Sequence, residues 1–160
     1  MKKKDQLNKV IRSITTTYDF ARRCTTVIRK ARDYVIDAKN LNRTTIAECE
    51  KAEKTIFGMK VEAYLRNEFV SWEQGDKLDF KINGVEVDSK ATVGKTWMIP
   101  QEAVGEICLL TNLNEKANAF KIGLLIANKY ALSNSCNQDR KHHVSARGKQ
   151  RIHWLVEGTY

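Results

Sequence analysis

One stretch of the sequence alternates between apolar and polar residues around an Asn-Gly pair: Leu78-Asp79-Phe80-Lys81-Ile82-Asn83-Gly84-Val85-Glu86-Val87-Asp88-Ser89-Lys90. Alternation with a period of two is typical of half-buried β-strands, and Asn-Gly is the strongest short-range signal for a two-residue hairpin turn. The stretch therefore predicts an antiparallel hairpin. Its apolar residues, from Leu78 to Val87, should form one buried face.

The turn determines which side chains of this hairpin are neighbours. A two-residue loop at Asn83-Gly84 places Asp79 opposite Asp88, and Lys90 lies on the same face, one side-chain step further along. The Cβ atoms of opposed residues are about 4.5–5.5 Å apart, so two opposed aspartates repel each other unless something neutralises them.

Paired carboxylates beside a lysine suit metal-dependent chemistry on phosphate. Carboxylate oxygens are the hard ligands that Mg²⁺ and Mn²⁺ prefer. A nearby lysine can hold an attacking water or neutralise charge that develops on phosphorus. The alternative interpretation is an ordinary solvated strand face with Lys81–Glu86 and Lys90–Asp88 ion pairs.

The N-terminal quarter of the chain has a helical pattern. Apolar residues recur at three- and four-residue steps from Leu7 to Ala38, which is the period of one helix face. The helical region, residues 5–38, is therefore predicted to be one long helix or two joined helices. If there are two, either Thr15-Thr16-Thr17 or Thr25-Thr26 marks the break.

Later segments add both helices and strands. A capping box at Thr45-Ile46-Ala47-Glu48 predicts the start of another helix, with a bend at Gly58. Two further strands are predicted at Ile107–Thr111 and Ala119–Ile126, and a final helix over residues 146–155. Helices mixed with strands in this order indicate an α/β fold.

Length and charge limit what the chain can be. With 160 residues, of which 42% are apolar and 29% charged, it suits one globular domain and not a disordered segment. The net charge of +9 is uneven, since residues 1–45 carry +8, residues 46–106 carry −4 and residues 107–160 carry +5. Two basic ends around an acidic centre favour a polyanionic partner and place the chemistry in the centre.

Nothing in the sequence predicts a membrane or secreted protein. The longest apolar runs, such as Ile107–Leu110, fall far below the ~18 residues of a membrane span. No apolar stretch follows the basic Met1–Asp5, as it would in a signal peptide. The cysteines are widely spaced, without a Cys-x-x-Cys pair, and are expected to be reduced thiols. We therefore expect a cytoplasmic protein.

The hairpin carries a resemblance to a nuclease signature. Asp79 with Asp88-Ser89-Lys90 has the form Asp-x₈-Asp-x-Lys, which is similar to the PD-(D/E)xK signature. With the flanking sequence, the chain resembles the NaeI-type restriction endonucleases over roughly residues 25–155. The flanking segments are Glu53-Lys54-Thr55 to Val61-Glu62, Trp97-Met98-Ile99-Pro100-Gln101-Glu102 with Ile107-Cys108-Leu109, and Asn137-Gln138-Asp139-Arg140-Lys141.

The resemblance implies a restriction-endonuclease-like fold, a mixed β-sheet flanked by helices. It also implies a Mg²⁺-dependent type II restriction endonuclease that hydrolyses phosphodiester bonds in double-stranded DNA at a short specific site. Asp79 and Asp88 would then bind Mg²⁺, for which Mn²⁺ can substitute. Glu62 would complete the metal site, and Lys90 would serve the attacking water. Because the stretch from Glu62 to Asp79 is about one residue longer than the family pattern, Glu68 remains a rival to Glu62.

We expect a single nuclease domain over residues 1–160, with a catalytic core at about 45–130 and a basic C-terminal segment at 137–157. The NaeI pattern includes a second, C-terminal DNA-binding domain, for which a chain of this length leaves no room. Each nuclease domain has one metal centre, so cutting both DNA strands in register predicts a homodimer with two-fold symmetry.

The C-terminal segment supplies most candidate DNA contacts. Its Lys and Arg side chains suit phosphates, while Asn and Arg side chains can pair with base edges. Trp97 is a further candidate, for stacking on a base, although core packing is the commoner role of a tryptophan. The candidate DNA contacts are Trp97, Asn137, Asp139, Arg140, Lys141, Arg147 and Lys149.

The sequence is also compatible with two other functions. A strand-nicking repair nuclease would use the same residues and differ only in its product. A non-catalytic basic DNA-binding module would carry the hairpin without a metal. Gly94-Lys95-Thr96 resembles the end of a P-loop, but the first glycine of that motif would fall at position 89, which is Ser89, so no nucleotide is expected.

Overall fold

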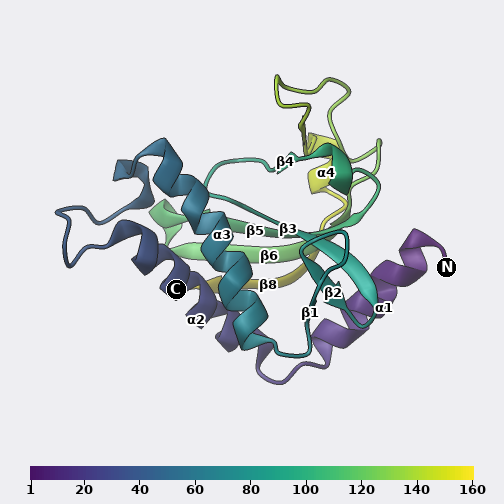
Figure 1. Cartoon of the computed structure of the whole chain (residues 1–160), viewed down its shortest axis with the longest axis horizontal. Coiled ribbons are helices and arrows are strands. Elements are labelled where there is room, and N and C mark those ends of the chain that lie inside the picture. The colour runs from purple at the N-terminus through teal and green to yellow at the C-terminus, as the bar shows by residue number, and fades with distance from the viewer.

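Three helices cover one face of a mixed six-stranded sheet in the computed structural model of the protein, which describes residues 1–160 (Figure 1). The helices are α1 (Lys3–Thr15), α2 (Phe20–Ile36) and α3 (Lys51–Glu68). The strands are β1 (Glu73–Gln74), β2 (Phe80–Ile82), β3 (Val85–Thr92), β5 (Ile107–Asn114), β6 (Ala119–Ile126) and β8 (His153–Thr159), which lie in the order β1-β2-β3-β5-β6-β8. Only β3 and β5 pair in parallel. The predicted α/β architecture is confirmed.

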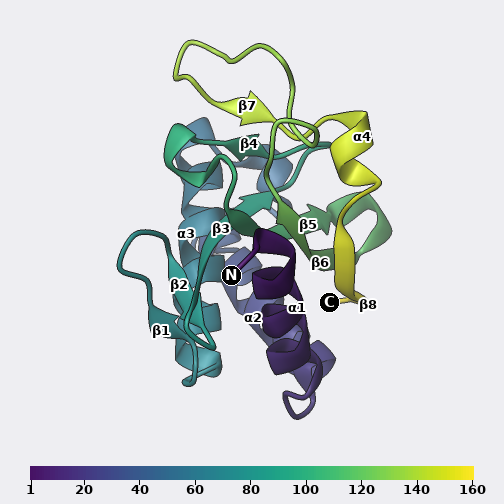
Figure 2. The same ribbon diagram turned by 90° about the vertical axis from the view of Figure 1, so that its right-hand side faces the viewer.

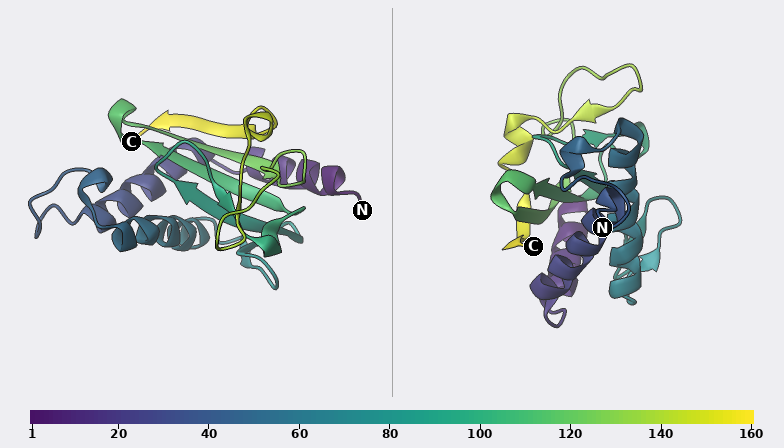
Figure 3. Two further views of the ribbon diagram at one scale, coloured as in Figure 1. Left: turned by 90° about the horizontal axis from the view of Figure 1, so that it is seen from above. Right: turned by 90° about the vertical axis from the view of Figure 1, so that its left-hand side faces the viewer.

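The other face of the sheet carries a smaller layer (Figure 2). It contains a two-stranded ribbon of β4 (Met98–Ile99) and β7 (His142–His143), and the one-turn helix α4 (Ala146–Lys149). Apolar side chains form two cores, with 26 buried residues on the helix face and 11 on the other. Figure 3 shows α2 and α3 packed together on one side of the sheet. Single 3₁₀ turns lie at η1 (Ile46–Glu48), η2 (Gln101–Ala103) and η3 (Glu115–Ala117).

The helical N-terminal region consists of two helices, and the break lies at the first threonine cluster. The hydroxyls of Thr16 and Thr17 each donate a hydrogen bond of 2.9 Å to a carbonyl four residues earlier. Asp19 then takes a left-handed backbone conformation, with φ of 51°. Such side-chain bonds compete with the backbone ladder and turn the chain at this point.

The hairpin has the predicted register. Asn83 and Gly84 both have positive φ, 51° and 77°, as a type I′ turn requires. Phe80 pairs with Val87 and Ile82 with Val85, and their apolar face is buried. Strand β2 begins at Phe80, so the regular ladder ends one residue short of Asp79 and Asp88.

The third helix begins later than predicted. Thr45 makes no side-chain cap, and only a single 3₁₀ turn follows it. The capping box forms instead between Glu50 and Glu53, where the Glu53 side chain accepts from the Glu50 backbone N–H. The predicted bend at Gly58 is also wrong, since α3 runs through it unbroken. One interior glycine costs a helix only about 1 kcal/mol relative to alanine, which tertiary packing offsets.

The predicted final helix over residues 146–155 is wrong beyond its first turn. Helix α4 ends at Lys149, and His153–Thr159 form strand β8, which pairs with the edge of β6. Gly148 packs so closely on the Ala131 carbonyl oxygen that a Cβ there would lie 2.0 Å from it. The free edge of β6 offers a full ladder of hydrogen bonds, which outweighs the local helical spacing of the apolar residues.

The cysteines and the helices bear on two further expectations from the sequence. All four cysteines are free thiols, as predicted. None of the helices combines the length and apolar character that a membrane crossing requires.

Gly148 and Gly58 make a matched pair for testing the packing of α4. We predict that Gly148→Ala lowers the free energy of unfolding by about 1–3 kcal/mol, because the new methyl group would clash with the backbone of Ala131, which must move. Gly58→Ala should raise it by about 0.5–1 kcal/mol, because its methyl group would contact Ala91 at an ordinary 3.8 Å inside a helix. Urea denaturation measures both. Equal stability of the two variants would contradict the close contact at Gly148.

Candidate active site

The edge of the sheet opens where β2 ends. Strand β2 pairs with β3 only as far as Val87, and from Asp88 to Thr92 β3 has β5 on one side and no strand on the other. Helix α3 lies along this open part of β3. Acidic side chains from α3, from the residue before β2 and from β3 meet here.

Two aspartates and a lysine form the centre of the site. The Asp79 carboxylate accepts a hydrogen bond of 2.7 Å from the Ser89 N–H. Asp88 is almost fully buried, with 4% of its surface exposed, and lies within hydrogen-bonding reach of Asp79. Its Oδ2 atom lies 3.1 Å from Lys90 Nζ but has no well-aligned hydrogen bond. Asp88 is therefore a buried carboxylate whose charge is only partly satisfied.

Helix α3 adds Glu62 and Arg66 to this centre. The Glu62 carboxyl lies within hydrogen-bonding reach of the Asp79 carboxylate. One turn later, Arg66 donates a hydrogen bond of 2.9 Å to the Asp79 carbonyl and lies 3.5 Å from Glu62 Oε1. Sequence reasoning missed Arg66, although its i, i+4 spacing from Glu62 was a usable signal. The rival Glu68 is turned away and pairs with Arg23 at 2.7 Å.

The solvated-face interpretation of the hairpin holds only in part. The Lys90–Asp88 contact is present, but the expected Lys81–Glu86 pair is not. Lys81 pairs with Asp76, and Glu86 Oε1 accepts two 2.7 Å bonds from the N–H groups of Asp76 and Lys77. Glu86 thus anchors the loop that leads into Asp79, while Asp88 is removed from solvent.

Burial and mutual repulsion change the acidity of these groups. Burial raises the pKa of Glu62 to about 7, and the hydrogen bond to Asp79 adds to this. Burial also raises the pKa of Asp88 to about 6, against the effect of the Lys90 charge. Burial acts to raise the pKa of Asp79 as well, but hydrogen bonds from Glu62 and Ser89 hold it below its usual value. Clusters of carboxyls with opposed shifts are typical of functional sites.

Lys90 is held in its charged form. Burial alone would lower the pKa of its ammonium group, but the Asp88 and Asp79 carboxylates raise it above the ordinary value. With both carboxylates charged, Lys90 can therefore donate hydrogen bonds and supply positive charge.

The donor set fits a hard divalent cation. Glu62, Asp79 and Asp88 form a chain of pairwise contacts with Asp79 in the middle, and no three His, Cys, Asp or Glu side chains converge as a preformed metal site. The buried Asp88 oxygen without a hydrogen bond and the adjacent Asp79 carboxylate are the ligands that such a cation seeks. Binding it would neutralise the charges whose burial and mutual repulsion raise the pKa of Glu62 and Asp88.

The predicted DNA contacts lie on the opposite layer. The loop from Ser133 to Lys141 stands out from the body beside β7 (Figure 2). The Asn137 side chain closes its tip, since Asn137 Oδ1 accepts from the N–H groups of Asp139 and Lys141. Only the amide nitrogen of Asn137 is left for a base. Asp139 and Arg140 are exposed, and Gln101 holds the Arg140 carbonyl at 2.7 Å.

Two further predictions for this layer differ in outcome. Trp97 cannot stack on a base, because it is 4% exposed and its indole N–H donates to the Thr111 carbonyl at 2.9 Å. The structure therefore supports core packing, the commoner role of a tryptophan, for Trp97. Arg147 is exposed, and together with Arg151 it flanks the exposed ring of Tyr130, at 4.9 and 4.5 Å from the ring centre. Lys149 follows on the same turn, half-buried.

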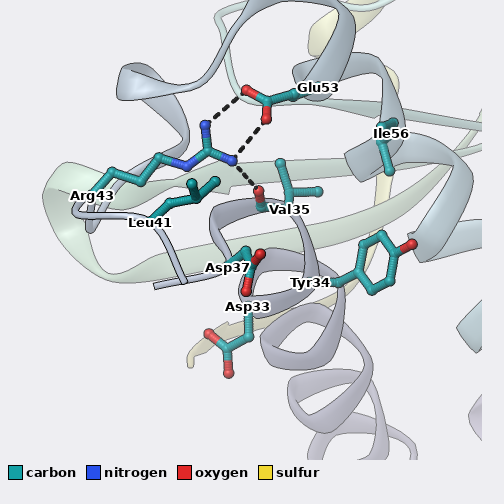
Figure 4. A pocket seen from close by; sticks show the side chains of 8 residues that line it. All are labelled: Asp33, Tyr34, Val35, Asp37, Leu41, Arg43, Glu53 and Ile56. Atoms are coloured by element: carbon teal, nitrogen blue, oxygen red, sulfur yellow. Dashed lines mark hydrogen bonds and ion pairs between the residues drawn. The ribbon is translucent and has the colours of Figure 1, made fainter. Parts of the chain in front are cut away.

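A separate pocket of about 420 Å³ lies between α2 and α3 (Figure 4). Arg43 crosses it and binds Glu53 through two 2.8 Å hydrogen bonds, with a third to the Val35 carbonyl at 2.9 Å. None of the acidic residues of the candidate active site lines this pocket. The Arg43 and Glu53 charges are paired with each other, and the pocket takes no part in the site.

The acidic cluster predicts how stability depends on pH. Since the pKa of Glu62 is about 7 and that of Asp88 about 6, both above their unfolded values, the metal-free folded chain takes up protons as pH falls from 8 to 6. The free energy of unfolding should rise by about 1.3 kcal/mol over this window for Glu62 alone. Glu62→Gln should flatten the rise, and the exposed Glu102→Gln should not. A rise that is identical in both variants, measured by denaturation in chelator, would contradict this description of the cluster.

One restriction endonuclease family matches almost the whole chain. Residues 8–159 match the family described as restriction endonuclease NaeI. The type II restriction enzyme NaeI of Lentzea aerocolonigenes is 31% identical over 127 residues, which are 79% of this chain and 39% of that enzyme. The chain thus spans well under half the length of this relative. Because the family match extends through both the helical layer and the acidic cluster, the protein belongs to the NaeI restriction endonuclease family.

Proposed function

We propose that the chain is a Mg²⁺-dependent endonuclease that hydrolyses phosphodiester bonds in double-stranded DNA at a short specific site. The observation that supports this most is the gathering of Glu62, Asp79, Asp88 and Lys90 at the open edge of β3. Family membership and the name of the relative, a type II restriction enzyme, point to the same reaction.

In this proposal Asp79 and Asp88 hold the Mg²⁺ ion, with Glu62 beside them and Mn²⁺ able to substitute. When bound, the ion lowers the pKa of a water molecule and neutralises charge on the reacting phosphate. The protein groups around it orient the reaction. Ser89 and Arg66 fix Asp79 from two sides, and the charged Lys90 offers donors to the attacking water and to a phosphate oxygen.

The basic C-terminal segment is the proposed DNA-holding surface. Arg140 and Lys141 on the protruding loop, with Arg147 and Lys149 on α4, have no carboxylate partners and can contact phosphates. The chain has one acidic cluster, so cutting both strands takes two chains. We therefore propose a homodimer with two-fold symmetry.

Cleavage of a supercoiled plasmid tests the reaction directly. With Mg²⁺ present we expect linear product from the unchanged chain, and Asp88→Ala should abolish cleavage while DNA binding remains. Lys30→Ala, at an exposed position on α2 without an ion pair, is the control and should cut normally. Undiminished cutting by Asp88→Ala would end the proposal. Nicked product alone would favour the strand-nicking alternative, and binding without any product would favour a non-catalytic module.

Kinetics of a Lys90 variant can distinguish a role of this residue in cleavage from a role in DNA binding. Lys90→Met keeps the length of the side chain and removes its charge. We expect the single-turnover cleavage rate to fall by about 10²-fold or more, because a donor aimed at developing charge is lost. Affinity for DNA should change less than about threefold. A weakened affinity with an unchanged rate would show that Lys90 only holds the DNA backbone.

A further inference from the structure

Besides the basic C-terminal segment, a second group of basic residues lies near the end of β3, the strand whose open edge carries the acidic cluster. A cavity of about 620 Å³ opens between the start of α3, the turn after β3 and the connection from β5 to β6. These segments meet at the same end of the molecule, on the left of Figure 1. The residues that line it include Lys54, Lys95, Asn112, Glu115 and Lys116.

Positive charge in this cavity is not neutralised. Lys54, Lys95 and Lys116 come from three separate segments, and none forms an ion pair. The one carboxylate in the lining, Glu115, is engaged elsewhere. It binds Arg32 at 3.0 Å and accepts from the Ile46 N–H. Three lysines thus face a space with no anion of the protein to pair with.

The cavity includes the sequence that resembles a P-loop, but it is not one. Gly94-Lys95-Thr96 follows β3 as the motif would, yet no helix follows it, and the next element is β4. The Thr96 hydroxyl donates to the Val144 carbonyl at 2.8 Å, so it is not free for a metal or nucleotide. Gly94 and Lys95 both line the cavity, and Lys95 brings the only charge of this segment to it. Its chemistry suits an isolated phosphate group better than a nucleotide.

Two elements connect the cavity to the acidic cluster. Lys54 precedes Glu62 by eight residues on α3, about 12 Å at 1.5 Å per residue. Lys95 follows Lys90 by five residues, at most about 17 Å at 3.4 Å per residue. Each strand of duplex DNA carries one phosphate per about 3.4 Å of helix axis. A DNA strand held at the acidic cluster therefore has another phosphate within reach of the lysines, no more than about five nucleotides away.

We propose that Lys54, Lys95 and Lys116 bind a backbone phosphate of the DNA strand, a few nucleotides from the phosphate that is cut. The naming of DNA as ligand rests on the proposed function. The cavity then fixes the strand at a second point along the edge of β3. It holds the scissile phosphate in register with Asp79 and Asp88.

The test measures DNA affinity in the cleavage-deficient Asp88→Ala background with Mg²⁺ present. In the triple variant Lys54→Ala, Lys95→Ala and Lys116→Ala, the negative slope of log K against log salt should become shallower by about 0.9, the value for one phosphate contact. Binding should weaken equally for different DNA sequences. Lys30→Ala on α2 is the matched control. An unchanged slope, or a change equal to that of the control, would overturn the proposal. If the triple variant fails to fold, the exposed Lys95→Ala and Lys116→Ala are measured singly.

Duplexes in which one backbone linkage is uncharged can locate the contact. Duplexes with a single methylphosphonate, placed in turn at each of the five positions on either side of the cut, should show one position that weakens binding of the parent chain and leaves the triple variant unaffected. Absence of such a coupled position contradicts the proposal. So does binding of inorganic phosphate by the cavity without any effect of the lysines on DNA.

Failure of the two proposals can be told apart. If the unchanged chain does not cut DNA but the coupled position exists, the phosphate site stands and the endonuclease proposal fails. If the chain cuts and no coupled position exists, only the phosphate site fails.

Discussion

Two carboxylates of like charge lie side by side at the edge of the sheet, and much of the surrounding structure serves to keep them there. Asp88 is almost fully buried and Asp79 is within reach of it, an arrangement that costs free energy in the absence of a cation. The Ser89 N–H, the Arg66 guanidinium and the Lys90 ammonium each offset part of that cost. The part of this cost that is not offset is reflected in the pKa values of Glu62 and Asp88, which burial and repulsion raise.

The fold explains how such a site can exist. The pairing of β2 with β3 ends at Val87 of β3. Beyond Val87, β3 is an edge strand that α3 covers from one side only. The parallel pairing of β3 with β5 keeps the strand rigid on its other side. Asp79 stands just before the hairpin and is fixed by the loop that Glu86 anchors. Precise placement of the carboxylates thus depends on a short β2 and a well-anchored loop.

Local patterns were sufficient for the parts of the fold that local chemistry decides. Asn83-Gly84 admits few turns, so the hairpin, its register and the proximity of Asp79 to Asp88 followed from the sequence. Strand β8 did not, because residues 153–159 form a strand only when the edge of β6 is available to them. The start of α3 was misplaced because Thr45-Ile46-Ala47-Glu48 and Glu50–Glu53 both offer capping chemistry, and only the second is used.

The candidate site was predictable to a similar degree. Asp79, Asp88 and Lys90 meet as the hairpin spacing implied, and Glu62 lies beside them as the resemblance implied. Their roles remain predictions. The spacing of Arg66 from Glu62 indicated that the two could pair, but the bond from Arg66 to the Asp79 carbonyl and the burial of Trp97 depend on packing between distant segments. The three lysines of the cavity come from separate parts of the chain and could be grouped only in three dimensions.

The central claim is that Asp79 and Asp88 together bind a divalent cation before DNA is present. Calorimetric titration of the metal-free chain with Mg²⁺ or Mn²⁺, with and without Asp79→Ala, tests it most directly. We expect saturable binding of metal to the unchanged chain and its loss in Asp79→Ala, while the exposed Glu102→Gln binds normally. Equal binding by the unchanged chain and Asp79→Ala, or none by either, would contradict it.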